Sequence, residues 1–307
     1  GSISHVQEML DSFGPKPSED TDIFAWAYTS RRQNTLSVFS YNANPQGYYS
    51  KPARQFVHDF LLPHMATDYA LDDKGRLLSG QPKATAAVKK SFNNLTLLSY
   101  SYGSVFAQEV YNASRATMEQ LGYSEKDSKY LLSRIHQISL GAVSRPMQEY
   151  DRYTSICMVA TNDRISNHKR RIWWSFGELF AAYAKKLTIK KLSKRSWYIS
   201  APVQKDLWEE KTTKNGETEM RNVRHLFPKW WVRASHHELP HYTTDQDSSN
   251  EFAKIARFAL INSVLRDKTL RPQDMIAPPQ KLLEQTPALQ ADCAAYQKRI
   301  ARALGKS

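Results

Sequence analysis

The sequence predicts an α/β protein with a mostly parallel β-sheet, and two observations lead to that prediction. Apolar runs of strand length alternate along the chain with longer segments of helical periodicity, as in proteins whose parallel strands are joined by helices. One apolar run, S-I-C-M-V-A at Ser155–Ala160, contains no charge, which is typical of a strand covered on both faces. We therefore expect a sheet with helices on both of its faces.

The composition excludes several other classes of protein. The 307 residues are 41% hydrophobic and 24% charged, which fits one large globular domain, here taken as 1–307. Two cysteines, Cys157 and Cys293, exclude a disulfide scaffold and a four-cysteine zinc site. No apolar window is long enough to cross a membrane, and no signal peptide is visible. We therefore expect a soluble protein, either cytoplasmic or secreted without a visible signal peptide.

The first part of the chain supplies the elements that lead up to the motif of interest. Two apolar runs predict strands, a polar N-A-N-P-Q-G segment predicts a loop, and aromatic and leucine residues at helical spacing predict a helix after it. A further helix, a short apolar strand and a long helix closed by Gly122 follow. In order, these elements are strands Ile23–Thr29 and Leu36–Tyr41, loop Asn42–Gly47, helices Lys51–Met65 and Ala84–Phe92, strand Leu95–Tyr100 and helix Val105–Leu121.

The alternation of helix and strand continues to the end of the chain. The polar segment Lys205–Arg221 carries Asn215-Gly216, which predicts an exposed hairpin or loop. A serine at 248 or 249 is a suitable cap for the helix that follows, and the last helix is amphipathic. The remaining elements are helix Lys126–Arg134, strands Ile135–Val143 and Ser155–Ala160, helix Ile172–Lys186, a strand-like run at Trp230–Ala234, and helices Asn250–Arg266 and Pro287–Leu304.

A serine-centred motif, S-Y-S-Y-G at 99–103, lies where the strand Leu95–Tyr100 gives way to the long helix. A serine with small residues two positions away on either side is the pattern of a nucleophile elbow, in which a sharp turn presents the hydroxyl at the helix amino terminus. The helix dipole and free N–H groups there favour developing negative charge. The motif makes Ser101 a candidate nucleophile; the alternative is a serine that merely caps the helix.

Two later segments supply possible partners for Ser101. Asp163 follows the uncharged strand in T-N-D-R-I, where it could orient an imidazole or simply cap a turn. His236, His237 and His241 cluster in S-H-H-E-L-P-H, where one of them could act as a base or all could lie in a solvated loop. The letters H-E-L-P-H also match a zinc motif that requires a helix, but Pro240 would break that helix. We therefore expect no metal or other cofactor.

These segments, in the order serine, acid, histidine, resemble the α/β-hydrolase superfamily over about residues 95–250. Lipase-like effectors of intracellular bacteria offer a looser resemblance. The resemblance implies the α/β-hydrolase fold and a serine esterase or lipase that forms an acyl-enzyme, with Ser101 as nucleophile, His236 or His237 as base and Asp163 orienting the base. It also implies an oxyanion hole built from the Tyr102 N–H and a second donor near Asn42. Ser99 stands where the family usually has glycine, and no His-Gly oxyanion signature follows an early strand.

Basic residues give the chain its formal net charge of +13, and ten of them lie between Arg164 and Arg195. We interpret 164–222 as a basic, partly helical insertion or lid before the last strand, and 268–307 as a C-terminal helical extension. Aromatic residues in the basic stretch could reach an anionic membrane surface or a lipid ester, and they could also pack on the sheet. The candidate residues for anionic-surface binding are Lys169, Arg170, Arg171, Lys185, Lys186, Lys190 and Lys191.

Two other classes of function remain open at this point. A binding module could keep the α/β-hydrolase fold without activity, which would be consistent with Ser99 and the missing oxyanion signature. A basic nucleic-acid-binding protein is the third class, although no nucleic-acid-binding signature is present and we do not expect nucleic acid to be the partner. The expected partner is therefore a small-molecule or lipid ester, and no protein partner is indicated.

Overall fold

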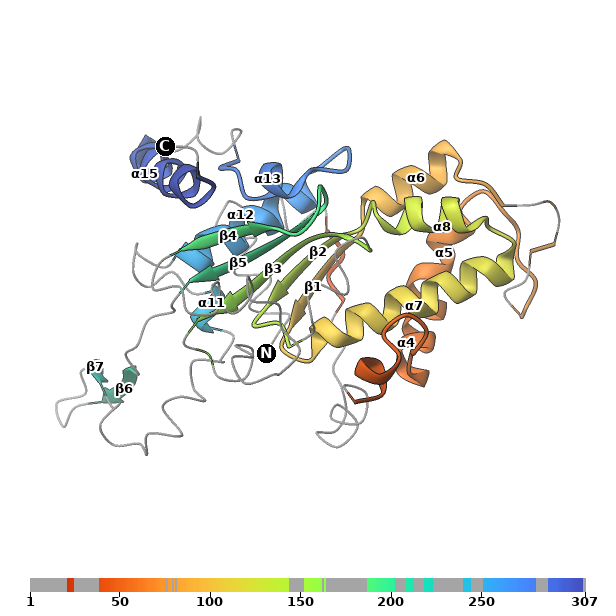
Figure 1. Ribbon diagram of the computed structural model, residues 1–307, viewed down its shortest axis with the longest axis horizontal. Coiled ribbons are helices and arrows are strands. Elements are labelled where there is room, and N and C mark those ends of the chain that lie inside the picture. The colour runs from red at the N-terminus through yellow and green to blue at the C-terminus, as the bar shows by residue number, and fades with distance from the viewer. Residues whose placement is uncertain are drawn as a thin grey trace.

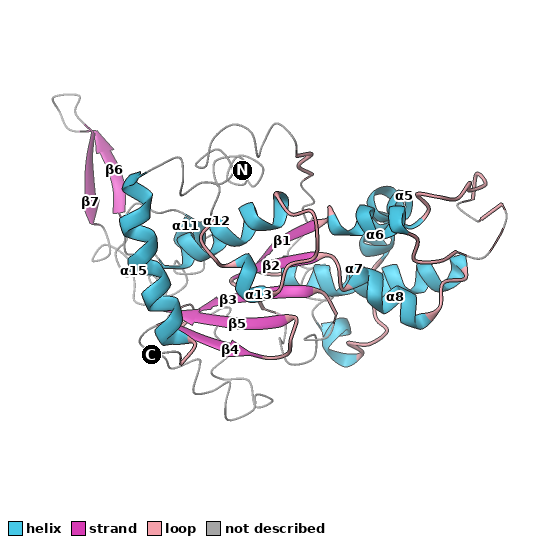
Figure 2. Ribbon diagram, turned by 90° about the horizontal axis from the view of Figure 1, so that it is seen from above, coloured by secondary structure: helices cyan, strands magenta, loops and turns pink. Residues whose placement is uncertain are grey.

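The computed structural model is a five-stranded, mostly parallel β-sheet with helices on both faces (Figure 1). It describes residues 21–24, 39–74, 77–78, 80, 82–143, 152–161, 163, 187–201, 208–212, 218–222, 240–243, 251–279 and 287–305. The strand order is β1-β2-β3-β5-β4, seen across the sheet in Figure 2, and only β4 runs antiparallel to its neighbour. The predicted α/β class is therefore confirmed. No helix in the described part of the chain is both long and apolar enough to span a membrane.

Most of the predicted elements are present with boundaries shifted by a few residues. The strands of the main sheet are β1 (Thr96–Tyr100), β2 (His136–Leu140), β3 (Thr154–Ala160), β4 (Thr188–Lys191) and β5 (Ser196–Ala201). The larger helices are α4 (Lys51–Phe56), α6 (Ala86–Asn93), α7 (Gly103–Leu121), α8 (Glu125–Leu132), α12 (Glu251–Val264) and α15 (Pro287–Ala303). A π-helical segment, η1 (Val57–Leu61), joins α4 to α5 (Leu62–Met65), and the short helices α11 (Pro240–Thr243) and α13 (Pro272–Met275) flank α12. The predicted hairpin is β6 (Trp208–Thr212) paired with β7 (Thr218–Asn222).

Helices α7 and α12 cover opposite faces of the sheet, as the alternation of side chains along β2 shows. Ile138 and Leu140 lie in one buried cluster with Phe252 of α12. The intervening Gln137 instead accepts a hydrogen bond from Gln108 of α7, with Nε2 to Oε1 at 3.1 Å. Because successive strand residues point to opposite faces, the two helices must lie on opposite sides. The expectation of helices on both faces is therefore confirmed.

One predicted strand near the start of the chain is wrong. Residues 39–43 are helical, so Leu36–Tyr41 does not end as a strand, and Ile23 and Phe24 of the other predicted strand have no regular structure. Tyr41 is fully buried against Val105 and Val143, and Arg152 donates a hydrogen bond to its hydroxyl (3.3 Å). These tertiary contacts outweigh the period-two alternation of S-V-F-S-Y. The rest of both predicted strands, 25–38, lies outside the described residues.

The range 164–222, assigned to an insertion, contains two strands of the main sheet. β5 pairs in parallel with β3, and β4 pairs with β5 at the edge of the sheet, so the insertion cannot include them. Lysines surround β5 in the sequence, but its own segment, S-W-Y-I-S-A, is as free of charge as β3. Lys190 and Lys191 lie on β4, where lysine is a common edge-strand residue. The predicted helix Ile172–Lys186 and the run at 230–234 lie outside the described residues.

The C-terminal segment packs on the sheet through α12. Asn262 of α12 donates Nδ2 hydrogen bonds to the carbonyl oxygens of Asp274, Met275 and Ala277, at 3.3, 2.8 and 2.7 Å. Met275 and Tyr296, from α13 and α15, belong to the same buried cluster as β2 and β3. In the range 268–307, predicted as an extension, these side chains of α13 and α15 therefore contribute to the main core.

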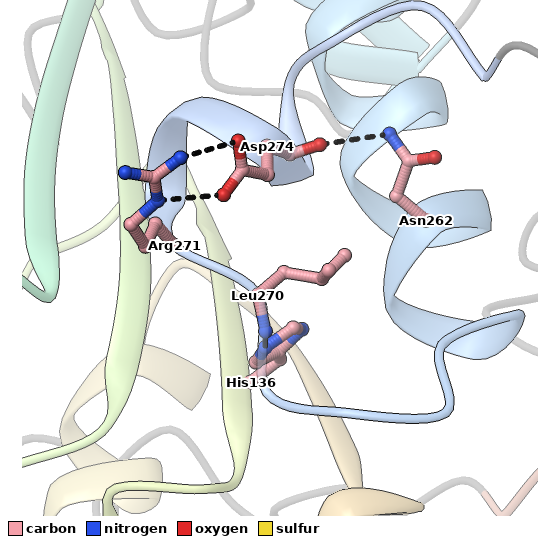
Figure 3. A network of polar contacts seen from close by, with 5 residues as sticks. All are labelled: His136, Asn262, Leu270, Arg271 and Asp274. Atoms are coloured by element: carbon pink, nitrogen blue, oxygen red, sulfur yellow. Dashed lines mark hydrogen bonds and ion pairs between the residues drawn. The ribbon is translucent and has the colours of Figure 1, made fainter.

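A buried histidine ties the amino end of β2 to this C-terminal segment (Figure 3). His136 Nε2 accepts a hydrogen bond from the Leu270 N–H at 3.2 Å, so its Nδ1 carries the proton and donates to Ser263 Oγ at 2.8 Å. Burial, with the positive charge of Arg266, lowers the pKa of His136 to about 3. The ring is therefore neutral in the folded protein at physiological pH.

The low pKa of His136 predicts a loss of stability in mild acid. In the unfolded state His136 has a pKa near 6.5, so it binds a proton there at a higher pH than in the folded state. The contribution of His136 to the free energy of unfolding is therefore full above pH 6.5 and falls as the pH drops toward 3. We expect the free energy of unfolding to be about 2 kcal/mol lower at pH 5 than at pH 7 from this group alone. Urea unfolding of wild type and His136→Gln at both pH values measures it. An equal pH dependence in the two proteins would contradict this assignment.

Candidate active site

Ser101 lies in a strained turn between β1 and α7. Its φ is 54°, and no other non-glycine residue in the described part of the chain has a positive φ. That conformation costs an L-residue roughly 1–2 kcal/mol. Hydrogen bonds hold it from both sides: the Ser101 N–H donates to the Leu140 carbonyl (3.0 Å), and the Ser101 carbonyl accepts from Ser104 Oγ (2.8 Å). The local geometry is therefore that of the strand–nucleophile–helix turn predicted from the sequence.

The two small residues of the motif face each other across this turn. A Cβ built on Gly103 would lie 3.6 Å from the Cβ of Ser99, an ordinary van der Waals contact. The Ser99 hydroxyl is buried and hydrogen-bonded to Ser139 Oγ at 2.8 Å, and Ser139 in turn accepts from Gln137 Nε2 at 2.9 Å. Serine at the position where glycine is usual is thus accommodated by a buried polar layer between the sheet and α7.

The contact at Gly103 predicts a size limit. Alanine fits the space, so Gly103→Ala should change the free energy of unfolding by less than about 1 kcal/mol. Leucine adds atoms that must displace Ser99 or the first turn of α7, so Gly103→Leu should cost about 1–3 kcal/mol. Urea denaturation of both variants measures the difference. Equal stability of the leucine and alanine variants would show that strand and helix are not closely packed there.

The first turn of α7 offers unpaired backbone donors beside Ser101. Tyr102 is the N-terminal cap residue, without a side-chain cap bond. Its N–H, like that of Gly103, donates to no acceptor within the described residues. A helix amino terminus also carries partial positive charge. This turn could stabilise an oxyanion formed next to Ser101, the role predicted for Tyr102.

Asn42, the predicted second oxyanion donor, lies on a helical turn rather than in a loop. This turn is anchored beside α7: Asn112 Nδ2 donates to the Tyr48 and Pro45 carbonyls at 2.8 and 3.1 Å. The neighbouring Tyr41 belongs to the small cluster against which Tyr102 packs. Asn42 is half-buried. The segment is therefore close to the elbow, and the role of Asn42 itself stays a prediction.

Asp163 lies just beyond the carboxyl end of β3 and is fully buried. Its Oδ2 accepts a hydrogen bond from the Tyr242 hydroxyl at 2.8 Å. The same hydroxyl accepts a hydrogen bond from the Ala160 N–H at 3.2 Å. Tyr242 comes from α11 and is itself fully buried. Asp163 is therefore held in the interior by a tyrosine that sequence reasoning missed, since nothing in the sequence distinguishes Tyr242 from other buried tyrosines.

Ser101 and Asp163 share one edge of the sheet. β1, β2, β3 and β5 are parallel, so their carboxyl ends lie at the same edge. Backbone bonds continue past the strand ends there, from the Gly141 N–H to Met158 O (2.9 Å) and from the Thr161 N–H to Ala201 O (2.9 Å). Two strand spacings separate the ends of β1 and β3 by about 10 Å. An imidazole with a hydrogen bond on each side can join side chains that extend from these two ends.

The histidine cluster ends beside Asp163. His241 immediately precedes Tyr242 on α11, and Tyr242 contacts the aspartate. His236 and His237, the predicted bases, lie outside the described residues.

Besides the His136–Ser263 pair described above, the described residues contain a second serine–histidine pair. His64 Nδ1 lies 2.6 Å from Ser91 Oγ, and burial lowers the pKa of His64. Ser91 is on the last full turn of α6, where the surrounding backbone N–H groups are used within the helix. The pair thus lacks the strained turn and free donors that surround Ser101, which makes Ser91 a useful control.

Of the predicted anionic-surface residues, the structure describes Lys190 and Lys191. Both lie on the edge strand β4 rather than on a lid helix, and Lys191 Nζ lies 5.6 Å from the centroid of the Trp197 ring. The other candidates, Lys169, Arg170, Arg171, Lys185 and Lys186, lie outside the described residues. Among the residues described, no three His, Cys, Asp or Glu side chains gather as metal ligands would.

Sequence comparison assigns the chain to no known family. No protein-family model matches the chain, and no curated protein is significantly similar to it in sequence. The class that the fold itself defines is an α/β protein with a mostly parallel five-stranded sheet. Any finer assignment therefore depends on the site described above.

Proposed function

We propose that this protein is a serine hydrolase of the α/β-hydrolase type that cleaves an ester through an acyl-enzyme. The observation that carries the proposal is the strained Ser101 turn between β1 and α7, where the N–H groups of the next two residues donate to no acceptor in the described part of the chain. The buried Asp163 at the same sheet edge supports it, as does the sequence position of the histidines next to α11. The relative positions of serine, acid and histidine along the chain are those of a Ser-His-Asp triad.

In the proposed reaction, Ser101 Oγ forms a bond to the acyl carbonyl carbon while its proton passes to His236 or His237. The Tyr102 N–H, with the Asn42 segment, stabilises the negative oxygen of the tetrahedral intermediate. The bond to the leaving alcohol then breaks, and the histidine returns the proton to that alcohol. Water, deprotonated by the same histidine, then bonds to the acyl carbon, the bond from that carbon to Ser101 Oγ breaks, and the histidine returns the proton to Ser101 Oγ. Asp163 keeps the ring oriented and stabilises its cationic form.

The simplest test is turnover of p-nitrophenyl esters of increasing acyl length. Wild type and Ser91→Ala should hydrolyse one or more of them at comparable rates, whereas Ser101→Ala should not. If none of these esters is hydrolysed by correctly folded wild type, the binding-module alternative replaces the enzyme. If activity is lost in Ser91→Ala instead, the nucleophile has been misassigned.

The proposed setting at an anionic lipid surface is a separate part of the proposal. Its support is the basic stretch from 164 to 195, of which Lys190 and Lys191 are placed on an edge strand. Sedimentation with anionic and neutral vesicles, and with a single-stranded oligonucleotide, separates lipid from nucleic acid. Preferential binding to the oligonucleotide would contradict the lipid assignment.

A further inference from the structure

A basic hollow lies between α6 and α8. Figure 1 shows these two helices away from the junction of β1 and α7. It has a volume of about 500 Å³ and is lined by Lys83, Ala84, Lys89, Lys126, Asp127 and Tyr130. That volume is within the range of small-molecule sites. Both helices precede strands, α6 before β1 and α8 before β2, so the hollow belongs to the amino side of the sheet. It shares no residue with the candidate active site.

The charge of the lining is strongly positive. Three lysines line the hollow, and none of them forms an ion pair within the described residues. The opposing charge is Asp127, whose carboxylate already accepts a hydrogen bond from Ser124 Oγ at 2.9 Å. Lys129, on the same helix, is instead paired with Glu125 at 2.8 Å and does not line the hollow. The hollow thus holds three ammonium groups that form no ion pair with a carboxylate in the described part of the chain.

Helix geometry adds to this positive potential at α6, whose first turn holds no acidic residue, whereas the first turn of α8 already carries Glu125 and Asp127. Lys83 and Ala84 precede α6, which begins at Ala86, and Lys126 and Asp127 lie in the first turn of α8. The amino ends of two helices, each of eight residues, therefore meet at the same hollow. Helix amino termini carry partial positive charge and favour anions.

Tyr130 supplies a positioned hydroxyl. Two cations lie near its ring, with Lys89 Nζ at 5.8 Å and Arg134 Cζ at 5.2 Å from the centroid. Arg134 Nη1 donates to the Tyr130 hydroxyl at 2.7 Å, which leaves the phenolic proton available for another acceptor. The side chain is 43% exposed, so that acceptor can come from a ligand.

We infer that the hollow between α6 and α8 is a binding site for clustered phosphate groups, as in a polyphosphate or a multiply phosphorylated headgroup. Three unpaired ammonium groups match several adjacent negative charges, and Tyr130 can donate to a phosphate oxygen. The site is independent of the proposed hydrolase activity, so failure of either proposal leaves the other intact.

Calorimetric titration with inorganic tripolyphosphate at low ionic strength tests the site. Replacing Lys83, Lys89 and Lys126 together by glutamine should raise the Kd by roughly tenfold or more. The matched control replaces the exposed Lys51, Lys74 and Lys298, which changes the net charge equally and should leave the Kd within about twofold. Tyr130→Phe should weaken binding by a few-fold, since it removes one hydrogen bond.

Vesicle binding distinguishes a phosphorylated lipid headgroup from a soluble phosphate ligand. The ligand is a lipid headgroup if the protein binds phosphatidylcholine vesicles that carry phosphatidylinositol bisphosphate. Tripolyphosphate should then compete with this binding, and the variant with Lys83, Lys89 and Lys126 replaced should lose it. Tripolyphosphate binding without vesicle binding would assign a soluble ligand. The proposal is overturned if tripolyphosphate does not bind, if both triple variants lose affinity equally, or if the three lysines matter only for binding an oligonucleotide.

Discussion

Replacing Ser101 by alanine should lower kcat/KM for ester hydrolysis by roughly four orders of magnitude or more, with the fold retained. The loss follows because the variant lacks the alcohol hydroxyl of the strained turn between β1 and α7, beside the Tyr102 and Gly103 N–H groups, which donate to no acceptor within the described residues. Steady-state kinetics measures the loss, and circular dichroism verifies folding. Ser91→Ala is the matched control, because Ser91 contacts a histidine but lies outside the strained turn.

Ser101→Gly distinguishes the energetic cost of the positive φ from the loss of the nucleophile. Glycine adopts positive φ without penalty, so Ser101→Gly should raise the free energy of unfolding by about 1 kcal/mol relative to Ser101→Ala while remaining inactive. Urea denaturation gives the difference. Equal stability of the two variants would mean that the positive φ stores no strain, and substantial activity in either would refute Ser101 as the nucleophile.

Asp163→Asn should lower kcat/KM by roughly 10³- to 10⁴-fold with little change in stability. Asparagine keeps the shape and can still accept the hydrogen bond from the Tyr242 hydroxyl, but it cannot stabilise a cationic imidazole. Kinetics across pH, together with thermal unfolding, measures both effects.

Tyr242→Phe is the control that distinguishes orientation of Asp163 from its charge. It removes the hydroxyl bonded to Asp163 and to the Ala160 N–H, so we expect a stability loss of about 1–3 kcal/mol and a smaller loss of activity than in Asp163→Asn. If Asp163→Asn stays within about tenfold of wild type, the aspartate is only a structural partner of Tyr242.

The elbow was predictable because its determinants are local. An uncharged run, a serine between small residues and a helix ending at Gly122 occupy consecutive positions, and Gly122 has the positive φ expected at a helix end. The same local pattern failed at Phe39–Tyr41, where alternation predicted a strand. There, contacts from Val105, Val143 and Arg152, all remote in sequence, accompany a helical turn.

Other features could not be found because their residues are scattered or their pattern is masked by charge. β4 and β5 lie in a lysine-rich range that composition assigned to an insertion, although β5 pairs with β3. The hydrogen bond from the Tyr242 hydroxyl to Asp163 joins residues 79 positions apart. The proposed phosphate-binding hollow takes Lys83 from the segment before α6, Lys89 from α6 and Lys126 from α8, and β1 and α7 separate these helices along the chain, so no linear run of charge marks it.

The site of covalent attachment of a fluorophosphonate tests the central claim most directly. After reaction with the folded protein and proteolysis, mass spectrometry should place the phosphonate on Ser101, and pretreatment with denaturant should abolish the adduct. An adduct on Ser91 or on another serine, or no adduct on folded and soluble protein, would contradict the proposal that the turn after β1 carries a reactive nucleophile.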